Sequence, residues 1–480
     1  MLPSRMLFPL LSVVFALWVV GLSIFIILER RAPAATIGWI FALLLLPYVG
    51  IPVYFLVGPR KWDGKKRHLA RTRALIGKEL GAAVQAANAR VSSSIPEDDA
   101  RLVALGSGLG AAAAACAREI EIFQGGAEFY AALEEAIAGA RHHIHLEFYI
   151  WSPDRIGTRL RDLLMKKVQE GVELRLLVDA VGSPKFDKDF MRPLQELGAE
   201  VLLFNKPKWF RLRSQLVNFR THRKIVVIDG ELSFIGGMNI SERSSKEFVD
   251  DRAQRDTHLK IVGMPSNWLQ LVFLENWHFS NGGGPSHEGY LALDTEPGTE
   301  PVQIVASGPD TEHAPIHKVY LEAIHGAKQR IWIVSPYFVP DVSLVSALQS
   351  AALRGVDVRV LVPAKNDQRL VRAASRTYYD ELIDCGVRIF EYLPRMHHAK
   401  TLIADDDLCI IGTANLDNRS FRLNFEVIAV LYGLRHAAEM AAAFESDLLE
   451  SREAAWGEED DRPLPLRFGA AVARLLSPLL

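Results

Sequence analysis

Two short stretches of the chain carry the same set of reactive side chains in the same order. Each has the pattern H-x-K-x4-D-x6-G-x-x-N, and the second copy starts 176 positions after the first. The copies supply His222, Lys224, Asp229 and Asn239 in the first case and His398, Lys400, Asp405 and Asn415 in the second. One short motif can arise by chance, but two extended copies in one chain indicate a duplicated functional unit.

These residue types suit substitution at a phosphodiester. That reaction needs a nucleophile, a proton donor for the leaving alkoxide, and cations or amides that hold the nonbridging oxygens. Imidazoles attack or transfer protons, lysines neutralise phosphate, and asparagine amides donate hydrogen bonds. The set therefore predicts phosphoryl chemistry without a metal or a cofactor. Asp229 and Asp405 join the catalytic set, with a structural role at a strand-to-turn junction as the alternative.

Each histidine also needs a carboxylate on its second nitrogen, which fixes the tautomer. In the second half the candidate is Glu426, which follows His398 by 28 positions. The same offset in the first half reaches Asp250. Asp256, however, leads a β-prone run as Glu426 does, with a glycine seven positions further in both cases. We select Asp256 as the orienting residue of the first half and keep Asp250 as the alternative.

The segments around the motifs repeat as well and predict α/β units. Helical stretches at 157–170 and 341–354 precede the similar strands 171–178 and 355–362, and further strands are expected at 201–204 and 388–392. Within each motif, apolar β-prone residues follow the Lys, so a strand is expected there. The period of two would place the His and the Lys on one face of that strand.

The N-terminal region is strongly apolar. Residues 6–28 and 32–59 contain no charged side chain, and each run exceeds the about 20 residues that cross a bilayer. Residues 60–78 carry eight Lys or Arg against one Asp, which places the following chain on the cytoplasmic side. We predict a transmembrane hairpin over 1–60, with a shallow re-entrant hairpin as the alternative, and a basic juxtamembrane linker over 61–100.

The overall composition limits the other function classes. The 55 basic and 57 acidic residues nearly cancel, which argues against a chain that is basic throughout, as many nucleic-acid binders are. Three widely separated cysteines exclude a disulfide framework. An electrostatic partner must therefore meet a local patch, and the basic segment beside the apolar runs favours anionic lipid.

Three further strings complete the pattern: SPYFVPD at 335–341, RDTH at 255–258 and NLDNRSFRLNFE at 415–426. With the duplicated motif they make the chain resemble the phospholipase D superfamily, and within it the bacterial cardiolipin synthases. One departure is that Gly237 and Thr413 stand where many members carry Ser. The resemblance implies an α/β fold of two pseudo-symmetric lobes, mixed sheets flanked by helices, over 101–290 and 291–455. A tail over 456–480 would form an amphipathic helix, either on the membrane or on the second lobe.

The resemblance also implies a reaction. The two halves would face each other and bring His222 and His398 to one phosphorus atom, with His222 attacking and His398 transferring protons, or the reverse. The implied reaction joins two phosphatidylglycerol molecules into cardiolipin and releases glycerol, at the inner membrane of a bacterium, with anionic phospholipids rather than nucleic acid as partners. Hydrolysis, transfer to another alcohol and a non-catalytic membrane scaffold are the alternatives. The complete His, Lys and Asn sets argue against the scaffold.

Overall fold

The computed structural model describes residues 4–28, 33–46, 84, 95, 99–205, 219–281, 288–311 and 313–479. The described N-terminal helices belong to one unit, and the described residues from 99 onward form another. In the first unit, α1 (Ser4–Leu28) packs against α2 (Pro33–Leu45) through Ile26 and Leu43. No helix in the described ranges combines the length and the hydropathy that a membrane crossing requires. The predicted linker over 61–100 lies almost entirely outside the described residues.

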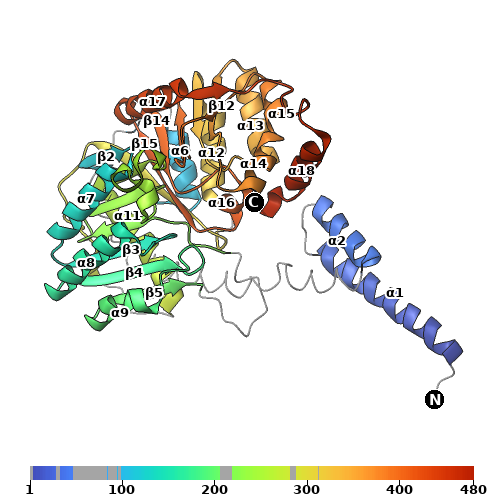
Figure 1. Ribbon diagram of the computed structural model, residues 1–480, viewed down its shortest axis with the longest axis horizontal. Helices are drawn as coiled ribbons and strands as arrows, with labels where there is room; N and C mark the ends of the chain where they lie inside the picture. Colours follow the sequence, from blue (N-terminus) through green and yellow to red (C-terminus); the bar gives the residue numbers. More distant parts are fainter. Residues whose placement is uncertain are drawn as a thin grey trace. The chain divides into compact units, whose positions relative to one another are not determined.

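The first lobe is built on a seven-stranded sheet with the order β2-β8-β7-β6-β3-β4-β5. β3, β4 and β5 are parallel and all other neighbours are antiparallel, so the sheet is mixed, as predicted. Helices α7, α8 and α9 cover one face and α11 packs on the other (Figure 1). The strands are β2 (Glu119–Phe123), β3 (His143–Phe148), β4 (Glu173–Asp179), β5 (Glu200–Phe204), β6 (Ile225–Ile228), β7 (Leu232–Gly236) and β8 (His258–Val262). The helices are α7 (Gly126–Gly139), α8 (Arg155–Gln169), α9 (Lys188–Glu196), α10 (Lys246–Val249) and α11 (Pro265–Asn281).

The second lobe repeats this arrangement. Its nine-stranded sheet has the order β1-β9-β15-β14-β13-β10-β11-β12-β16, and without the two edge strands the order matches that of the first sheet. The strands are β1 (Ala115–Ala117), β9 (Glu300–Ser307), β10 (Arg330–Val334), β11 (Asp357–Pro363), β12 (Arg388–Tyr392), β13 (Thr401–Ala404), β14 (Leu408–Gly412), β15 (Glu426–Tyr432) and β16 (Ser451–Glu453). The helices are α6 (Ala100–Gly108), α12 (Pro315–Gly326), α13 (Val342–Leu353), α14 (Arg369–Arg376), α15 (Tyr379–Ile383), α16 (Asn418–Arg422), α17 (Leu434–Leu449) and α18 (Leu464–Leu475).

The start of the first lobe differs from the expected boundary at residue 101. β1 precedes the first sheet in sequence, yet it pairs antiparallel with β9 of the second sheet. Leu102 of α6 likewise belongs to the core of the second lobe. The first sheet therefore begins at Glu119, and the segment before it completes the second lobe.

Helices α8 and α13 occupy equivalent places in the two lobes, and each begins after an Asp and is followed by a Gly. Asp154 accepts a hydrogen bond from the Gly157 amide at the start of α8, and Asp341 accepts one from Leu344 at the start of α13. Gly171 and Gly355 follow these helices with φ of 92° and 88°, a conformation that glycine adopts without strain. The helix-then-strand repeat predicted from sequence is confirmed at both positions.

Three large apolar clusters form the core of each lobe and the junction between the lobes. Alternate residues of β6 point to opposite faces: Val226 and Ile228 join the core beneath α7, α8 and α9, whereas Ile225 and Val227 join a central cluster. That central cluster also contains side chains of the second sheet, including Ile403 of β13. Because both lobes bury apolar surface in one shared cluster, they form a single compact unit.

Candidate active site

The reactive ends of the two motifs lie at equivalent strand ends. β6 begins directly after Lys224, and β13 begins directly after Lys400. Each pairs with the antiparallel strand that ends at the motif glycine, Gly236 or Gly412. A Cβ atom at Gly236 would lie 2.5 Å from the Cα of His258, so only glycine lets β8 approach this closely. The hairpin thus returns the motif Asn to the end of the sheet where its His lies.

Short backbone bridges join the two lobes beside each histidine. Thr221 forms a parallel bridge with Phe425, and the His222 amide donates to the Phe425 carbonyl oxygen at 2.9 Å. The second motif mirrors this contact, because His397 bridges Arg255 and the His398 amide donates to the Arg255 carbonyl oxygen at 2.6 Å. Each bridge therefore places a motif histidine beside the residue that precedes the orienting carboxylate of the other lobe.

The carboxylates consequently pair across the lobes. Nδ1 of His222 lies 3.0 Å from Oε2 of Glu426, and Nδ1 of His398 lies 2.7 Å from Oδ2 of Asp256. The sequence prediction paired each carboxylate with the histidine of its own half, and this pairing is wrong. Glu426 orients His222, and Asp256 orients His398. The alternative Asp250 lies in an exposed 3-10 turn and has no contact with either histidine among the described hydrogen bonds.

The pairing fixes the state of both imidazoles. A carboxylate only accepts hydrogen bonds, so we assign the proton of each neutral ring to Nδ1, which leaves the lone pair on Nε2. Nδ1 of His398 also lies 3.0 Å from Nζ of Lys400. Burial lowers the pKa of His222 to about 4, with Glu426 opposing the shift, so this ring is neutral near pH 7. Burial and the neighbouring Lys400 lower the pKa of His398 as well. Both carboxylates are ionised, because the positive groups around them outweigh the effect of burial and lower their pKa values.

The motif lysines are buried next to the histidines. Nζ of Lys224 donates to the main-chain carbonyl of His222 at 2.7 Å, and Lys400 makes the equivalent bond to His398. Burial lowers the pKa of Lys224 to about 7 and that of Lys400 to about 8. Neither lysine borders the cavity.

A cavity of about 800 Å³ lies between the lobes, and both reactive histidines border it. Asn239 and Asn415 border it too. Oδ1 of Asn239 accepts from the Ile150 amide at 3.1 Å, which leaves the NH₂ group of Asn239 available as a donor. Oδ1 of Asn415 is buried without a hydrogen-bond partner among the described residues. Four of the six side chains predicted to surround the phosphorus are thus brought together at one cavity, and the two lysines lie outside its lining.

The motif aspartates lie elsewhere. Asp229 follows β6 at the end opposite to His222, with φ of 53°, and accepts hydrogen bonds from the amides of residues 141–143. Asp405 follows β13 with φ of 50° and accepts from the amides of residues 328–330. Neither borders the cavity. Their inclusion in the catalytic set is wrong, because each carboxylate holds a loop to the end of a strand.

We expect Asp229→Ala to lower stability and leave catalysis nearly unchanged. Alanine removes three acceptor contacts and is strained at positive φ, so the midpoint of thermal unfolding should fall by roughly 2–6 °C. Turnover per folded chain should change less than about twofold. Asp405→Ala is the matched variant in the other lobe. A large loss of kcat without a change in the unfolding midpoint would contradict the structural role.

Thr413 and Gly237, which stand where many members of the superfamily carry Ser, each lie against an orienting carboxylate. Thr413 donates from Oγ1 to Oε2 of Glu426 at 2.5 Å, so its hydroxyl holds the carboxylate and does not border the cavity. In the first lobe a Cβ atom at Gly237 would lie 2.0 Å from Oδ1 of Asp256. Asp256, which is one methylene shorter than its counterpart Glu426, therefore occupies the space that a side chain at position 237 would need.

Several residues of the site were not predicted. The Tyr149 ring packs edge-on against the His222 ring with 5.1 Å between the ring centroids. Tyr337 and His398 pack in the same way with 6.4 Å between their centroids. Arg220 and Arg419 border the cavity and add positive charge to it. The position of Arg220, two residues before His222, was a usable signal, because residues just before a motif strand share its end of the sheet.

Comparisons with known proteins agree with this architecture. A family model described as "Cardiolipin synthase, PLD-like domain" matches residues 133–261 and 320–448, and one described as "Phospholipase_D-nuclease N-terminal" matches residues 11–59. The chain belongs to the cardiolipin synthase family. Each matched segment of this family contains one motif and one orienting carboxylate, as the predicted resemblance requires.

Relatives within the cardiolipin synthase family match nearly the whole chain. Cardiolipin synthase 1 of Bacillus anthracis is 35% identical over 99% of this chain and 94% of its own length. The cardiolipin synthase of Geobacillus sp. (strain WCH70) is 38% identical over 98% and 94%, respectively. Among solved structures, the phosphatidylserine synthase of Haemophilus influenzae Rd KW20 covers 79% of this chain and 100% of its own, with 15% identity and a TM-score of 0.60. At that identity the match supports the two-lobed fold alone.

Proposed function

We propose that this chain is a phosphatidyltransferase that converts two phosphatidylglycerol molecules into cardiolipin and glycerol. One observation carries the proposal: two imidazoles border the same cavity, and each is held by a carboxylate from the opposite lobe. A binding module needs no such pair of fixed tautomers, whereas a two-step exchange at phosphorus needs a nucleophile and a separate proton carrier. The cardiolipin synthase names of the relatives support the same reaction.

The reaction proceeds in two displacements. His398 takes up a second proton, on Nε2, when the first anionic lipid binds. Nε2 of neutral His222 attacks the phosphorus of that lipid, the bond from phosphorus to the headgroup glycerol breaks, and His398 gives its Nε2 proton to the leaving glycerol oxygen. The headgroup hydroxyl of the second lipid then transfers its proton to His398 and attacks the phosphorus. The bond to His222 breaks, and cardiolipin leaves with both histidines in their starting states. One phosphodiester replaces another, so no nucleotide is consumed.

The surrounding groups favour the charged phosphorus centre. The NH₂ group of Asn239, and that of Asn415 on the opposite side, are placed to donate to nonbridging oxygens, while Arg220 and Arg419 supply charge at the cavity wall. A bound phosphodiester is negative, so it raises the pKa of nearby His398 and helps that ring to carry the proton for the leaving glycerol. Preorganised donors of this kind stabilise the transition state because they need not reorganise during the reaction.

The N-terminal hairpin of α1 and α2 is proposed to attach the chain to the bacterial inner membrane, with the catalytic unit on the cytoplasmic side. Apolar side chains such as Leu17, Leu28 and Leu45 are exposed in this unit, which suits a lipid environment. The basic residues after position 59 favour the cytoplasmic orientation. Labelling of single cysteines on either side of the hairpin in sealed vesicles tests the topology; a catalytic unit that reacts from the outside would contradict it.

Lipid analysis tests the reaction itself. Purified full-length chain incubated with phosphatidylglycerol in mixed micelles is expected to yield cardiolipin and glycerol in equal amounts. Phosphatidic acid as the main product would instead indicate a hydrolase, and a mixed ester formed with an added alcohol would indicate a broader acceptor range. Absence of any turnover would favour a scaffold. The incubation is repeated with glycerol in excess, which should drive the exchange backwards and consume cardiolipin.

The pH dependence of kcat/KM follows from the buried lysines. Lys224 and Lys400 have pKa values near 7 and 8 in the free site, and the charged form is the protonated one. We therefore expect kcat/KM to fall as the pH rises, first as His398, whose pKa is lowered in the free site, loses its proton, and then through about 7–8 as the lysines lose theirs. On the acid side, His222 keeps its lone pair down to about pH 4. Arginine retains its charge, so Lys400→Arg should move the alkaline limb upward; an unmoved limb would show that another group titrates.

A further inference from the structure

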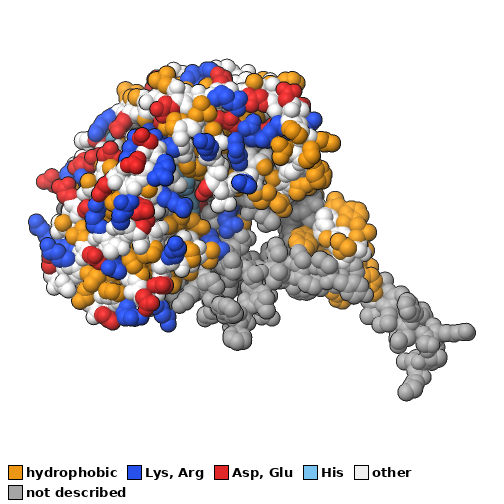
Figure 2. All heavy atoms as spheres, viewed as in Figure 1, with side chains coloured by type: hydrophobic (Ala, Val, Ile, Leu, Met, Phe, Trp, Pro, Cys, Tyr) orange, Lys and Arg blue, Asp and Glu red, His pale blue; other side chains and the backbone are white. Residues whose placement is uncertain are grey.

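The C-terminal helix α18 presents its large apolar side chains to the outside. Leu464, Phe468, Val472 and Leu475 recur at helical spacing and are 75%, 70%, 41% and 78% exposed. The buried residues of this helix are small, namely Ala470 and Ala473. A helix that only packs on a protein buries its bulky stripe, and here the orientation is reversed. Figure 2 shows hydrophobic side chains gathered over the region where Figure 1 places α18.

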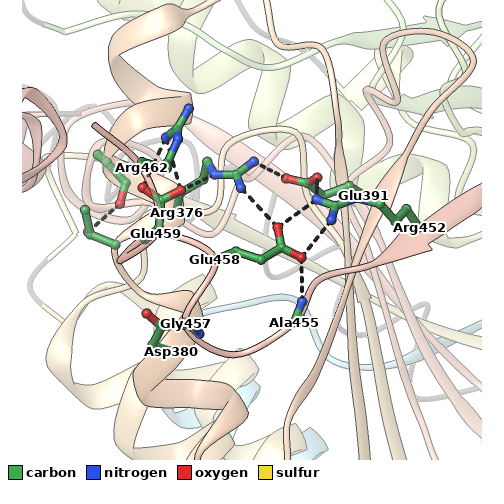
Figure 3. A network of polar contacts seen from close by, with 11 residues as sticks. Arg376, Asp380, Glu391, Arg452, Ala455, Gly457, Glu458, Glu459 and Arg462 are labelled. Atoms are coloured by element: carbon green, nitrogen blue, oxygen red, sulfur yellow. Dashed lines mark hydrogen bonds and ion pairs between the residues drawn. The ribbon is translucent and has the colours of Figure 1, made fainter. Parts of the chain in front are cut away.

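This orientation is fixed by a polar network in the segment before the helix (Figure 3). Arg376 of α14 pairs with Glu391 of β12 at 2.7 Å and also contacts Glu459. Arg452 of β16 pairs with Glu458 at 2.7 Å. The Gly457 amide donates to Asp380, and Arg462 pairs with Glu459, so the loop from 455 to 462 is tied to three neighbouring elements.

The far end of α18 is fastened as well. Tyr378 donates to or accepts from the hydroxyl of Ser477 at 3.0 Å, and Arg474 donates to the Thr377 carbonyl oxygen at 2.7 Å. Asn418 of α16 donates to the Ser477 carbonyl at 3.3 Å. Both ends of the helix are therefore held on the second lobe. The sequence left open whether the tail helix lies on the membrane or on the second lobe. Its inner face packs on the second lobe, and its outer face has no partner among the described residues.

The elements that hold α18 also border the active-site cavity. Asp367 and Gln368, just before α14, and Val371 within it line the cavity wall. Arg419 of α16 lines it from the neighbouring element. α18 therefore lies beside helices that line one side of the cavity.

We propose that the outer face of α18, defined by Leu464, Phe468, Val472 and Leu475, inserts into the surface of an anionic bilayer and seats the cavity entrance on it. The proposal deepens the lipid-transfer function and rests on it. Arg369 and Arg372 of α14 are exposed and form no ion pair among the described residues, so they can face anionic headgroups. In such a pose the apolar face of a helix lies about 5–10 Å into the boundary between headgroups and acyl chains.

The face suits a bilayer better than a second protein. A stable protein interface buries about 800 Å² on each partner, which exceeds what one short helical stripe can provide. A membrane interface needs only a linear apolar stripe flanked by cations. A lipid substrate whose phosphate must reach buried histidines also requires the entrance to lie against the bilayer, so that the acyl chains stay out of water.

Fluorescence quenching in bilayers tests the contact without relying on activity. In full-length chain carrying Cys385→Ser, which removes the partly exposed cysteine, a bimane probe is attached at Phe468→Cys or at Leu449→Cys on α17. In phosphatidylglycerol nanodiscs, lipids brominated near the top of the acyl chains should quench the probe at 468 and leave that at 449 unaffected. Equal, weak quenching at the two sites overturns the proposal. Probe-to-probe contact between two chains at 468 in lipid would also overturn it, in favour of a dimer.

A kinetic comparison supplies the functional arm. The triple change Leu464→Ser, Phe468→Ser and Leu475→Ser should lower turnover of long-chain phosphatidylglycerol in vesicles about tenfold, because part of the seating free energy is lost. Turnover of short-chain monomeric phosphatidylglycerol should stay within about twofold. The matched control replaces the exposed Val342, Leu434 and Leu449 with Ser and should change neither rate. Unchanged vesicle turnover in the α18 variant overturns the proposal, whereas absence of turnover with every substrate form overturns the proposed function and leaves the quenching result to judge α18.

Discussion

A chain with His398→Ala is expected to stop after the first displacement, with phosphatidyl attached to His222. The suitable substrate is a phosphatidyl ester of 4-nitrophenol, because nitrophenolate leaves without being protonated. One equivalent of nitrophenolate per chain should appear in a burst and then stall, since no base remains to activate the acceptor. The His222→Ala variant should show no burst. With phosphatidylglycerol as substrate, both variants should lose turnover by roughly 10⁴-fold or more.

Mass spectrometry of the stalled chain locates the adduct. The phosphatidyl group, or its phosphate after removal of the lipid, should lie on the peptide that contains His222. The two histidines have near-equivalent surroundings, so the measurement has a clear opposite result. A burst in the His222→Ala chain with the adduct on His398 would reverse the two roles. Bursts in both variants would falsify the division of labour between a nucleophile and a proton carrier.

The duplicated motif predicted most of the site because residue type and strand position together limit what a histidine can do. His222, His398, Asn239 and Asn415 come together at one cavity from the two strand ends that the repeat implied. The motif aspartates were misassigned for a physical reason. The four-residue strand β6 separates Lys224 from Asp229, so the two ends of the motif lie at opposite ends of that strand.

The cross-lobe pairing was outside the reach of sequence comparison. Alignment of the two halves shows that Asp256 and Glu426 are equivalent, but equivalence by pseudo-symmetry leaves open which histidine each one faces. The answer depends on the bridges at Thr221 and His397, which form only when the lobes pack. The edge strand β1 was missed for a similar reason, because three residues carry too little pattern to reveal a partner in the other sheet.

Glu426→Gln is expected to abolish the burst, and this is the sharpest test of the crossed pairing. A glutamine amide can donate to Nδ1 of His222, which moves the ring proton to Nε2 and removes the lone pair that attacks phosphorus. The rate of the first displacement should therefore fall about 10²- to 10⁴-fold. The unfolding midpoint should change little, because Gln keeps the size of Glu and the contacts of Thr413 and Asn424 around it.

Asp256→Asn gives the opposite signature with the same nitrophenyl ester. This residue contacts His398, whose proton transfer is not needed when nitrophenolate leaves, so the burst should persist while turnover of phosphatidylglycerol falls. If each carboxylate served the histidine of its own lobe, the two variants would exchange their behaviour. Glu391→Gln is the matched control, because Glu391 is buried in the second lobe and pairs with Arg376 and Arg452 rather than with a reactive histidine. Its burst should match that of the unmodified chain, which separates the loss of an orienting carboxylate from the general cost of altering a buried one.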